Sequence, residues 1–192
     1  MSNRYKNYRQ ELLKIIIVAE MLASMGVSAA VKMPAVFSDN MVLQRDTPVP
    51  VQGTADPGEN VTVIFVGQSK KTIADQTGKW KLTLDAMPRS AKPEKMQIIG
   101  KNNLTINNIL IGDIWLASGQ SNMQVPVTEA ENAEEEIKNA DFPEIRMFIV
   151  KNNISSTPQN DCEGEWFVCN PQNVPSFSAV AYFYIKIGRA HV

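Results

Sequence analysis

The sequence predicts a mostly β N-terminal domain that is followed by the beginning of an α/β layer. Residues 31–110 alternate short apolar and polar runs with turn-forming Asp, Pro, Gly and Asn, which is typical of an antiparallel sandwich. From Ile109 onward the apolar runs are nearly continuous, as in strands that are covered on both faces. A helix-like segment separates two of these runs, and this order favours parallel strands.

The composition is that of a globular protein and excludes several functional classes. The 192 residues are 44% hydrophobic and 20% charged, with 11 Pro and 10 Gly. Nineteen Lys and Arg oppose 20 Asp and Glu, and the net charge of −1 gives no electrostatic reason to expect a nucleic-acid partner. Two cysteines exclude a disulfide scaffold, and no His and Cys cluster supports a structural zinc site.

Residues 1–30 have the layout of a secretory signal peptide. A basic start precedes the apolar run at 15–27, and small residues follow at 28–30. The run has 13 residues, fewer than the roughly 20 that a spanning helix needs, so we expect no permanent membrane span. We expect a periplasmic or secreted protein whose mature chain begins near Val31. The alternative is an amphipathic first helix of a cytoplasmic protein.

Export would place the two cysteines, Cys162 and Cys169, in an oxidising compartment. A short disulfide-closed loop is then one possibility, and two free, buried thiols are the other. The sequence does not decide between them.

Within residues 31–110, two segments show the clearest strand patterns. Apolar residues alternate with their neighbours over 61–66, and Trp80, Leu82 and Leu84 alternate with polar residues over 79–84. We expect five to eight strands, separated by turns at 56–58, 75–78, 88–93 and 100–103. This stretch gathers no reactive side chains.

Residues 111–185 are predicted to begin an α/β domain. The runs 109–111 and 114–117 predict a strand that is covered on both faces, and the chain then breaks into SGQSN at 118–122. Thr128 and Glu131 have capping-box spacing, which predicts a helix that extends to about Ala140 and has a solvated glutamate-rich face.

The remainder of this region predicts a second strand and a second helix. Residues 145–150 form a further apolar run, and a polar loop is expected over 151–175. The resulting β-α-β order predicts a parallel sheet. A helix beginning near Ser176 would bury a stripe of four residues against this sheet, namely Phe177, Val180, Ala181 and Tyr184.

Ser121 is the candidate nucleophile. A serine between a buried strand and a helical turn projects its hydroxyl at the carboxyl edge of a sheet, where adjoining N–H groups can face an oxyanion. The small Gly119 permits close approach of a substrate carbonyl. The alternative is a polar loop that caps a helix and has no chemical role.

Several motifs resemble one family in one order along the chain. GDIWLASGQSNMQ at 112–124 resembles the first conserved block of the sialate O-acetylesterase family, a group within the SGNH (GDSL-like) hydrolases. MPAVFSDNMVLQR and PVPVQGTADPGENVTV resemble the β-domain of that family. FPEIRMFIV, GEWFVCNP and FSAVAYFY resemble its early catalytic domain. The resemblance implies a β-sandwich-like domain followed by the incomplete start of an SGNH-type, flavodoxin-like α/β hydrolase domain.

The resemblance also implies an activity and roles for individual residues. It implies an exported carbohydrate esterase that removes O-acetyl groups from sugars, with sialic acids as the favoured substrates. The reaction would pass through an acyl-serine intermediate and would need no metal or organic cofactor. Ser121 would be the nucleophile and its backbone N–H an oxyanion donor, while Gly119, Gln120 and Asn122 shape the loop. The Asp-x-x-His block of the family has no counterpart here, so the catalytic His and Asp are missing and we expect the chain alone to be inactive.

A different class of function stays open. The chain could be a non-catalytic β-sandwich module that binds carbohydrate or acts as a spacer. Exposed aromatic side chains would favour that function, but Trp80 lies in a half-buried pattern.

The last seven residues, 186–192, resemble the translation of a common sequencing-adapter oligonucleotide. The single histidine of the chain, His191, lies in this segment, so we expect it to have no catalytic role. A natural basic tail is the alternative. A terminal histidine that folds back as the base for Ser121 is the least favoured arrangement, because chain ends fray.

Overall fold

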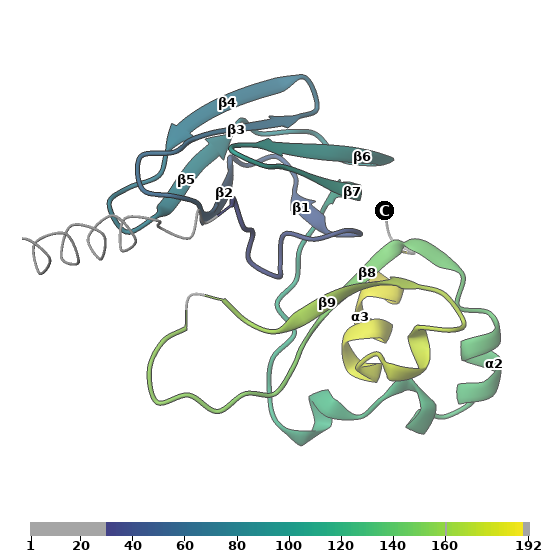
Figure 1. Cartoon of the computed structure of the whole chain (residues 1–192). Helices are drawn as coiled ribbons and strands as arrows, with labels where there is room; N and C mark the ends of the chain where they lie inside the picture. Colours follow the sequence, from purple (N-terminus) through teal and green to yellow (C-terminus); the bar gives the residue numbers. More distant parts are fainter. Residues whose placement is uncertain (1–29, 160, 190–192) are drawn as a thin grey trace, which may run out of the picture.

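The computed structural model describes residues 30–159 and 161–189. The predicted signal peptide, apart from Ala30, and His191 lie outside the described residues. The described chain forms a β-rich first part and a smaller second part with short helices (Figure 1). The strands of the first part are β1 Val42–Gln44, β2 Val49–Thr54, β3 Asn60–Phe65, β4 Gln68–Ile73, β5 Lys79–Leu84, β6 Ser90–Ile99 and β7 Asn103–Gly112.

Two sheets build the first part. The larger sheet has the strand order β1-β7-β6-β3-β4, and a two-stranded sheet pairs β2 with β5. The pair of β1 with β7 is parallel and the other pairs are antiparallel, so the larger sheet is mixed. The predicted alternation is confirmed in β3 and β5, where every second residue is buried.

A single apolar core lies between these sheets. Its members come from both, including Val51 of β2, Phe65 of β3 and Ile98 of β6, all fully buried. Trp80 of β5 is also buried, and its ring lies against Gly53 on the paired strand β2. A Cβ on Gly53 would lie 2.7 Å from the indole Cζ2 and in contact with the Lys32 carbonyl oxygen. The absence of a side chain at Gly53 therefore lets the indole pack on the neighbouring strand.

Two of the predicted turns coincide with glycines of positive φ. Gly58 and Gly78 have φ of 78° and 76°, so the turns predicted at 56–58 and 75–78 are confirmed. The tight β3–β4 turn at Val66 and Gly67 was not predicted, and both residues have positive φ there, as a type I′ hairpin turn requires. The turn predicted at 88–93 ends early, because β6 already begins at Ser90.

The prediction of a doubly covered strand over 109–117 is wrong. Residues 109–111 belong to β7, which lies between β6 and β1 in the first sheet, and they are buried, with Ile109 and Ile111 in the first core. Residues 114–117 pair with no strand in the described part of the chain, and the side chains of Ile114, Trp115 and Leu116 are exposed. An apolar run becomes a strand only where partner strands satisfy its backbone groups.

The second part contains one hairpin, two α-helices and three 3₁₀ turns. These are η1 Ser121–Gln124, η2 Val127–Glu129, α2 Ala133–Lys138, β8 Phe142–Val150, β9 Gly164–Cys169, η3 Val174–Ser176 and α3 Ala179–Arg189. A second core joins Val127, Ile145, Val174, Phe177 and Tyr182. The hairpin and α3 therefore pack around a core of their own (Figure 1).

The helix predicted from Thr128 to Ala140 is two shorter elements. Thr128 lies inside the 3₁₀ turn η2, and α2 begins at Ala133, after Asn132 with a left-handed φ of 57°. The capping box does not operate here, because Asn132 interrupts the helical backbone. The burial of Val127 in the second core anchors η2 separately from α2.

The predicted parallel sheet is also wrong. Strand β8 pairs antiparallel with β9, in register from Val150 with Gly164 to Arg146 with Val168. The polar loop predicted over 151–175 therefore contains a strand. Its signal was the apolar run WFVC at 166–169, which reaches β8 by a hairpin loop and not by a crossover helix.

The predicted stripe on the last helix is half correct. Phe177 and Ala181 are buried, but Val180 and Tyr184 are exposed, and Tyr182 is fully buried instead. Helix α3 begins at Ala179, and the helix face that carries Tyr182 packs against the second core. On the opposite side of α3, Tyr184 and Ile187 are exposed.

Two further expectations concern the cysteines and the membrane. Cys162 is exposed and Cys169 is buried, and neither forms a disulfide. Across residues 30–159 and 161–189, no helix is long and apolar enough to cross a bilayer.

Candidate functional site

Ser121 lies at the start of a short helical turn, as predicted, but the buried strand expected before it is absent among the described residues, so Ser121 does not follow a sheet edge. It is the first residue of η1, is exposed, and follows Gln120, whose backbone is extended. The N–H of Met123 donates to the Gln120 carbonyl (2.9 Å) and closes the turn. The N–H of Ala179 at the start of α3 donates to the Val125 carbonyl (2.8 Å), which holds the end of this loop against the second core.

Gly119 is held close to η1. A Cβ at Gly119 would lie 2.7 Å from Cγ of Met123, so the absence of a side chain lets Met123 fold back over the loop. Gln120 and Asn122 are exposed on either side of Ser121. The structure thus brings Gly119 and Met123 together and leaves the Ser121 hydroxyl accessible.

The partners that a serine nucleophile needs are not in the described residues. The only histidine of the sequence, His191, lies outside them, so the described structure places no imidazole beside Ser121. Over the same residues, no three His, Cys, Asp or Glu side chains gather in a way that could hold a metal ion.

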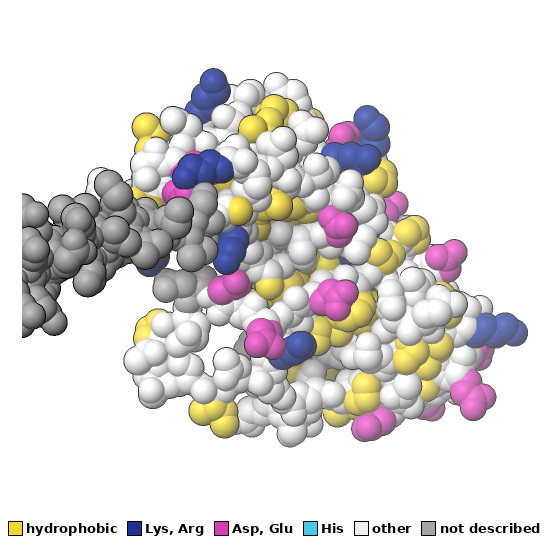
Figure 2. Space-filling model, in the orientation of Figure 1, with side chains coloured by type: hydrophobic (Ala, Val, Ile, Leu, Met, Phe, Trp, Pro, Cys, Tyr) yellow, Lys and Arg dark blue, Asp and Glu magenta, His cyan; other side chains and the backbone are white. Residues whose placement is uncertain are grey.

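A groove of about 1570 Å³ lies between the two parts of the molecule. The first part contributes residues around β1 and the end of β7, and the second contributes 114–117, β8 and the outer side of α3. Met123 and Gln124 of η1 also line it, whereas 118–122 do not. Ser121 therefore lies next to the groove and not inside it. In the same region between the two parts, Figure 2 shows hydrophobic side chains at the surface.

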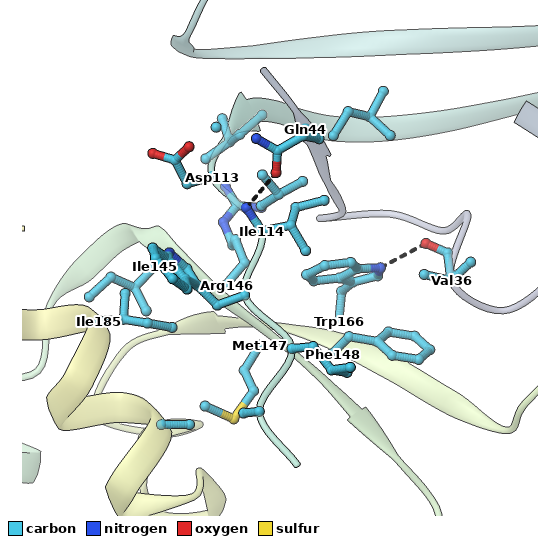
Figure 3. Close-up of a pocket in the computed structure, with 18 of the residues that line it drawn as sticks. Val36, Gln44, Asp113, Ile114, Ile145, Arg146, Met147, Phe148, Trp166 and Ile185 are labelled. Atoms are coloured by element: carbon cyan, nitrogen blue, oxygen red, sulfur yellow. Dashed lines mark hydrogen bonds between the residues drawn. The ribbon is translucent and has the colours of Figure 1, made fainter. Parts of the chain in front are cut away.

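Polar contacts at the groove tie the two parts together. The N–H of Ile114 donates to Oε1 of Gln44 (2.9 Å), and the indole N–H of Trp166 on β9 donates to the Val36 carbonyl (2.8 Å; Figure 3). Arg45 pairs with Asp113 at 2.9 Å, and this contact raises the pKa of the Arg45 guanidinium.

The apolar surface of the groove is unusually exposed. Leu116 is 94% exposed and Trp115 61%, although the sequence predicts both in a covered strand. The Trp115 ring meets the Tyr184 ring of α3 edge to face, with centroids 5.3 Å apart. Contiguous exposed apolar surface of this kind marks an interaction site or an aggregation risk.

Sequence reasoning missed Arg146, which crosses from β8 to the first part. Its guanidinium donates to the carbonyls of Asn40 (3.0 Å) and Asn108 (3.2 Å), and to Oδ1 of Asn108 (3.2 Å). Its Nε donates to the Pro143 carbonyl (2.8 Å). The available signal was a single arginine inside the apolar run IRMFIV.

Comparison with solved structures defines the class of protein. A carbohydrate acetylesterase from Xanthomonas citri superposes with a TM-score of 0.83 and 35% identity, over 85% of this chain and 38% of that one. The fold of most of this chain is therefore found in a carbohydrate acetylesterase.

Comparison with curated proteins identifies the family. Sialate O-acetylesterase of Mus musculus is 33% identical over 150 residues, and that of Homo sapiens is 32% identical over 152 residues. No family model matches the chain. The chain is a relative of the sialate O-acetylesterases, which confirms the resemblance of its motifs. It spans 27% of the length of the mouse protein and 28% of the human one.

Proposed function

We propose that this chain is part of an exported carbohydrate esterase that hydrolyses O-acetyl esters on sugars, with Ser121 as nucleophile. Sialic acids are the favoured substrates. The observation that carries the proposal is the GQSN loop, which presents an exposed serine at the first position of a helical turn in a relative of carbohydrate acetylesterases. This start of an SGNH-type hydrolase domain would be completed by residues outside the described structure.

In the proposed reaction, Oγ of Ser121 attacks the acetyl carbonyl carbon while a base takes the hydroxyl proton. The resulting oxyanion accepts a hydrogen bond from the backbone N–H of Ser121, because the first N–H groups of a helical turn have no partner within that turn. Collapse of this intermediate breaks the ester C–O bond, and the sugar oxygen leaves as a hydroxyl with that proton. Water then cleaves the acyl-serine and releases acetate.

The base must come from another part of the protein. The chain spans only about a quarter of the length of the curated relatives, and its one histidine is His191. We place the base in an Asp-x-x-His block outside this sequence, so the chain alone is inactive. A serine without its histidine loses several orders of magnitude in rate.

Covalent labelling tests the assignment of Ser121. A longer protein that contains this sequence and an Asp-x-x-His block should react with a fluorophosphonate probe, and mass spectrometry should place the label on Ser121. The present chain should label far more slowly under the same conditions. A label on another serine, or none on the longer protein, would contradict the proposal.

Export is a second element of the proposal. The described structure supports a mature chain that starts near Val31, because the Val31 side chain is buried in the first core and its N–H donates to Oδ1 of Asn102 (2.7 Å). Cleavage before Val31 would leave every strand of the first part intact. N-terminal sequencing of protein from the medium or periplasm should give Val31 or a near neighbour, and retention of Met1 would contradict export.

The alternative function is that of a non-catalytic carbohydrate-binding or spacer module. The structure of the first part gives this alternative little support. Trp80 is only 3% exposed, so this indole offers no face on which a sugar ring could stack. Absence of Ser121 labelling in the longer protein, together with carbohydrate binding by the first part, would favour this alternative.

A further inference from the structure

The turn that carries Asn40 and the position of Asn108 within strand β7 form an acceptor site on the first part of the molecule. Both residues have left-handed backbones, with φ of 70° and 57°. The side chains are joined by a hydrogen bond from Nδ2 of Asn108 to Oδ1 of Asn40 (2.7 Å). This arrangement directs two backbone carbonyls and one amide oxygen toward the same guanidinium, that of Arg146.

We propose that Arg146 is a positioning residue that sets the orientation of the sandwich relative to the β8–β9 hairpin, and with it the width of the groove beside Ser121. An arginine suits this role because its planar fork fixes several acceptors in one geometry. Its fourth bond, to the Pro143 carbonyl on its own strand, fixes the side chain before it crosses to the first part.

Apolar packing between the two parts cannot set this orientation alone. Trp166 of β9 belongs to the first core, and Phe148 of β8 packs against the same core. These contacts attract the hairpin to the sandwich, but burial of apolar area has no preferred direction. The hydrogen bonds of Arg146 are directional and half-buried, so they select one of the orientations that packing permits.

The exposed Arg89–Glu144 ion pair also links the two parts and serves as a comparison. It joins Nη2 of Arg89 to Oε2 of Glu144 at 3.0 Å, with both side chains more than a third exposed. A solvated pair of this kind contributes little. Loss of Arg89 should therefore leave the orientation unchanged.

A distance measurement on the present chain tests the proposal without any enzymatic activity. Spin labels are attached at Lys71→Cys on β4 and Lys138→Cys on α2, both exposed, in a Cys162→Ser background. The parent should give one narrow distance distribution. Arg146→Met should broaden it at least about twofold, because the variant loses every hydrogen bond from Arg146 to the first part and keeps only isolated ones, such as that from Trp166 to Val36. Arg146→Lys should broaden it less, and Arg89→Met should match the parent.

A narrow distribution for Arg146→Met at the parent distance would overturn the proposal. If circular dichroism shows that Arg146→Met does not fold, the double variant Asn40→Gly with Asn108→Gly decides instead. Glycine accepts the positive φ at both positions and keeps the backbone carbonyls, so only the amide contacts are lost. A folded double variant should show an intermediate width, and an unchanged width would overturn the proposal.

A kinetic comparison extends the test to activity and rests on the proposed function. In the longer protein, Arg146→Met should raise KM for an acetylated sugar about tenfold, equivalent to about 1.4 kcal/mol, and change kcat little. Ser121 labelling by a small fluorophosphonate should be unaffected, because that probe does not depend on the groove. If the fluorophosphonate does not label the parent enzyme, the proposed function is wrong. The distance measurement still tests the positioning role of Arg146 in that case. Equal loss of labelling and sugar hydrolysis would contradict a positioning role.

Discussion

At the scale of single residues, the loop at 118–122 contains two serines of different expected importance. Ser121 begins η1 and is the proposed nucleophile, whereas Ser118 precedes Gly119 and lies outside η1. Both are exposed, so accessibility does not distinguish them. Their difference is that Ser121 belongs to the turn η1 and Ser118 does not.

In the longer protein, we expect Ser121→Ala to lower the rate of sugar deacetylation by at least about 10³-fold, as loss of a nucleophile does. Ser118→Ala should have a much smaller effect, and it controls for changes in the shape of the loop. Acetate release from an O-acetylated sialic acid provides the measurement. Equal losses in the two variants would show that loop shape matters and not one hydroxyl.

Glu136 is a carboxylate whose pKa is shifted by its neighbours. It accepts hydrogen bonds from the buried Tyr182 hydroxyl (2.5 Å) and from the Lys186 ammonium (2.6 Å), so it joins α2 to α3. Burial by itself would raise the pKa of Glu136, but the bonds from Lys186 and Tyr182 outweigh it and lower the pKa below its usual 4.5. Burial and the carboxylate together raise the pKa of Tyr182, which keeps its hydroxyl a donor.

The lowered pKa predicts a pH-dependent stability. A carboxyl whose pKa is depressed by folding stabilises the protein above its unfolded pKa, and this contribution disappears as pH falls through the folded pKa. We therefore expect Glu136→Gln to cost about 1 kcal/mol at pH 7, and the gap from the parent to close at acidic pH. Urea unfolding from pH 7 to pH 3 measures this. The exposed Glu135→Gln on the same helix is the control, and a gap that is constant with pH would contradict the prediction.

At the scale of elements, the two-stranded sheet depends on a close approach between β2 and β5. Gly53 faces Trp80 across this pair, and the Lys32 carbonyl lies on its other side. The strand pattern at 79–84 predicts that Trp80 points inward. It does not predict that a glycine on the neighbouring strand makes room for the indole.

Substitution of Gly53 tests this contact. Gly53→Ala should destabilise the chain by about 1–3 kcal/mol, because its methyl group meets backbone on one side and a packed ring on the other. Gly112→Ala is the matched control, since its Cβ would lie 3.6 Å from Cγ1 of Val42, an ordinary contact. Chemical denaturation should show a change within about 0.5 kcal/mol for that control. Similar losses at the two positions would show that the close approach to Trp80 is not the reason why residue 53 is a glycine.

At the scale of the whole molecule, two cores are joined across a groove with apolar walls. The sandwich core and the hairpin core each bury their own side chains, and Trp166 links the hairpin to the first core. Between them, Ile114, Trp115 and Leu116 remain exposed along one extended segment. The isolated chain should therefore bind hydrophobic dyes and self-associate.

Removal of one groove side chain should reduce this association without loss of fold. Leu116→Asn should lower dye fluorescence and the amount of oligomer in sedimentation, with stability within about 0.5 kcal/mol of the parent. Ile154→Asn is the control, because Ile154 is fully exposed in a loop and does not line the groove. If both variants reduce association equally, general surface hydrophobicity is responsible and not the groove.

The amino-acid sequence by itself determined the features that depend on local chemistry. The alternation in β3 and β5 follows from a two-residue period, and Gly58 and Gly78 mark turns because glycine accepts positive φ without steric cost. The GQSN motif located the loop of Ser121 in the same way, from adjacent residues, while the resemblance to the family rests on this motif together with those on both sides of it.

Only the tertiary structure decided which segments meet. Residues 114–117 read as a strand but find no partner among the described residues, and β8 takes β9 as an antiparallel neighbour where a parallel one was expected. Arg146 finds its acceptors at Asn40 and Asn108, far away along the chain. Pairing and burial depend on groups that are distant in sequence. A local apolar pattern therefore limits which secondary structures a segment can form, and its neighbours in space decide which one it forms.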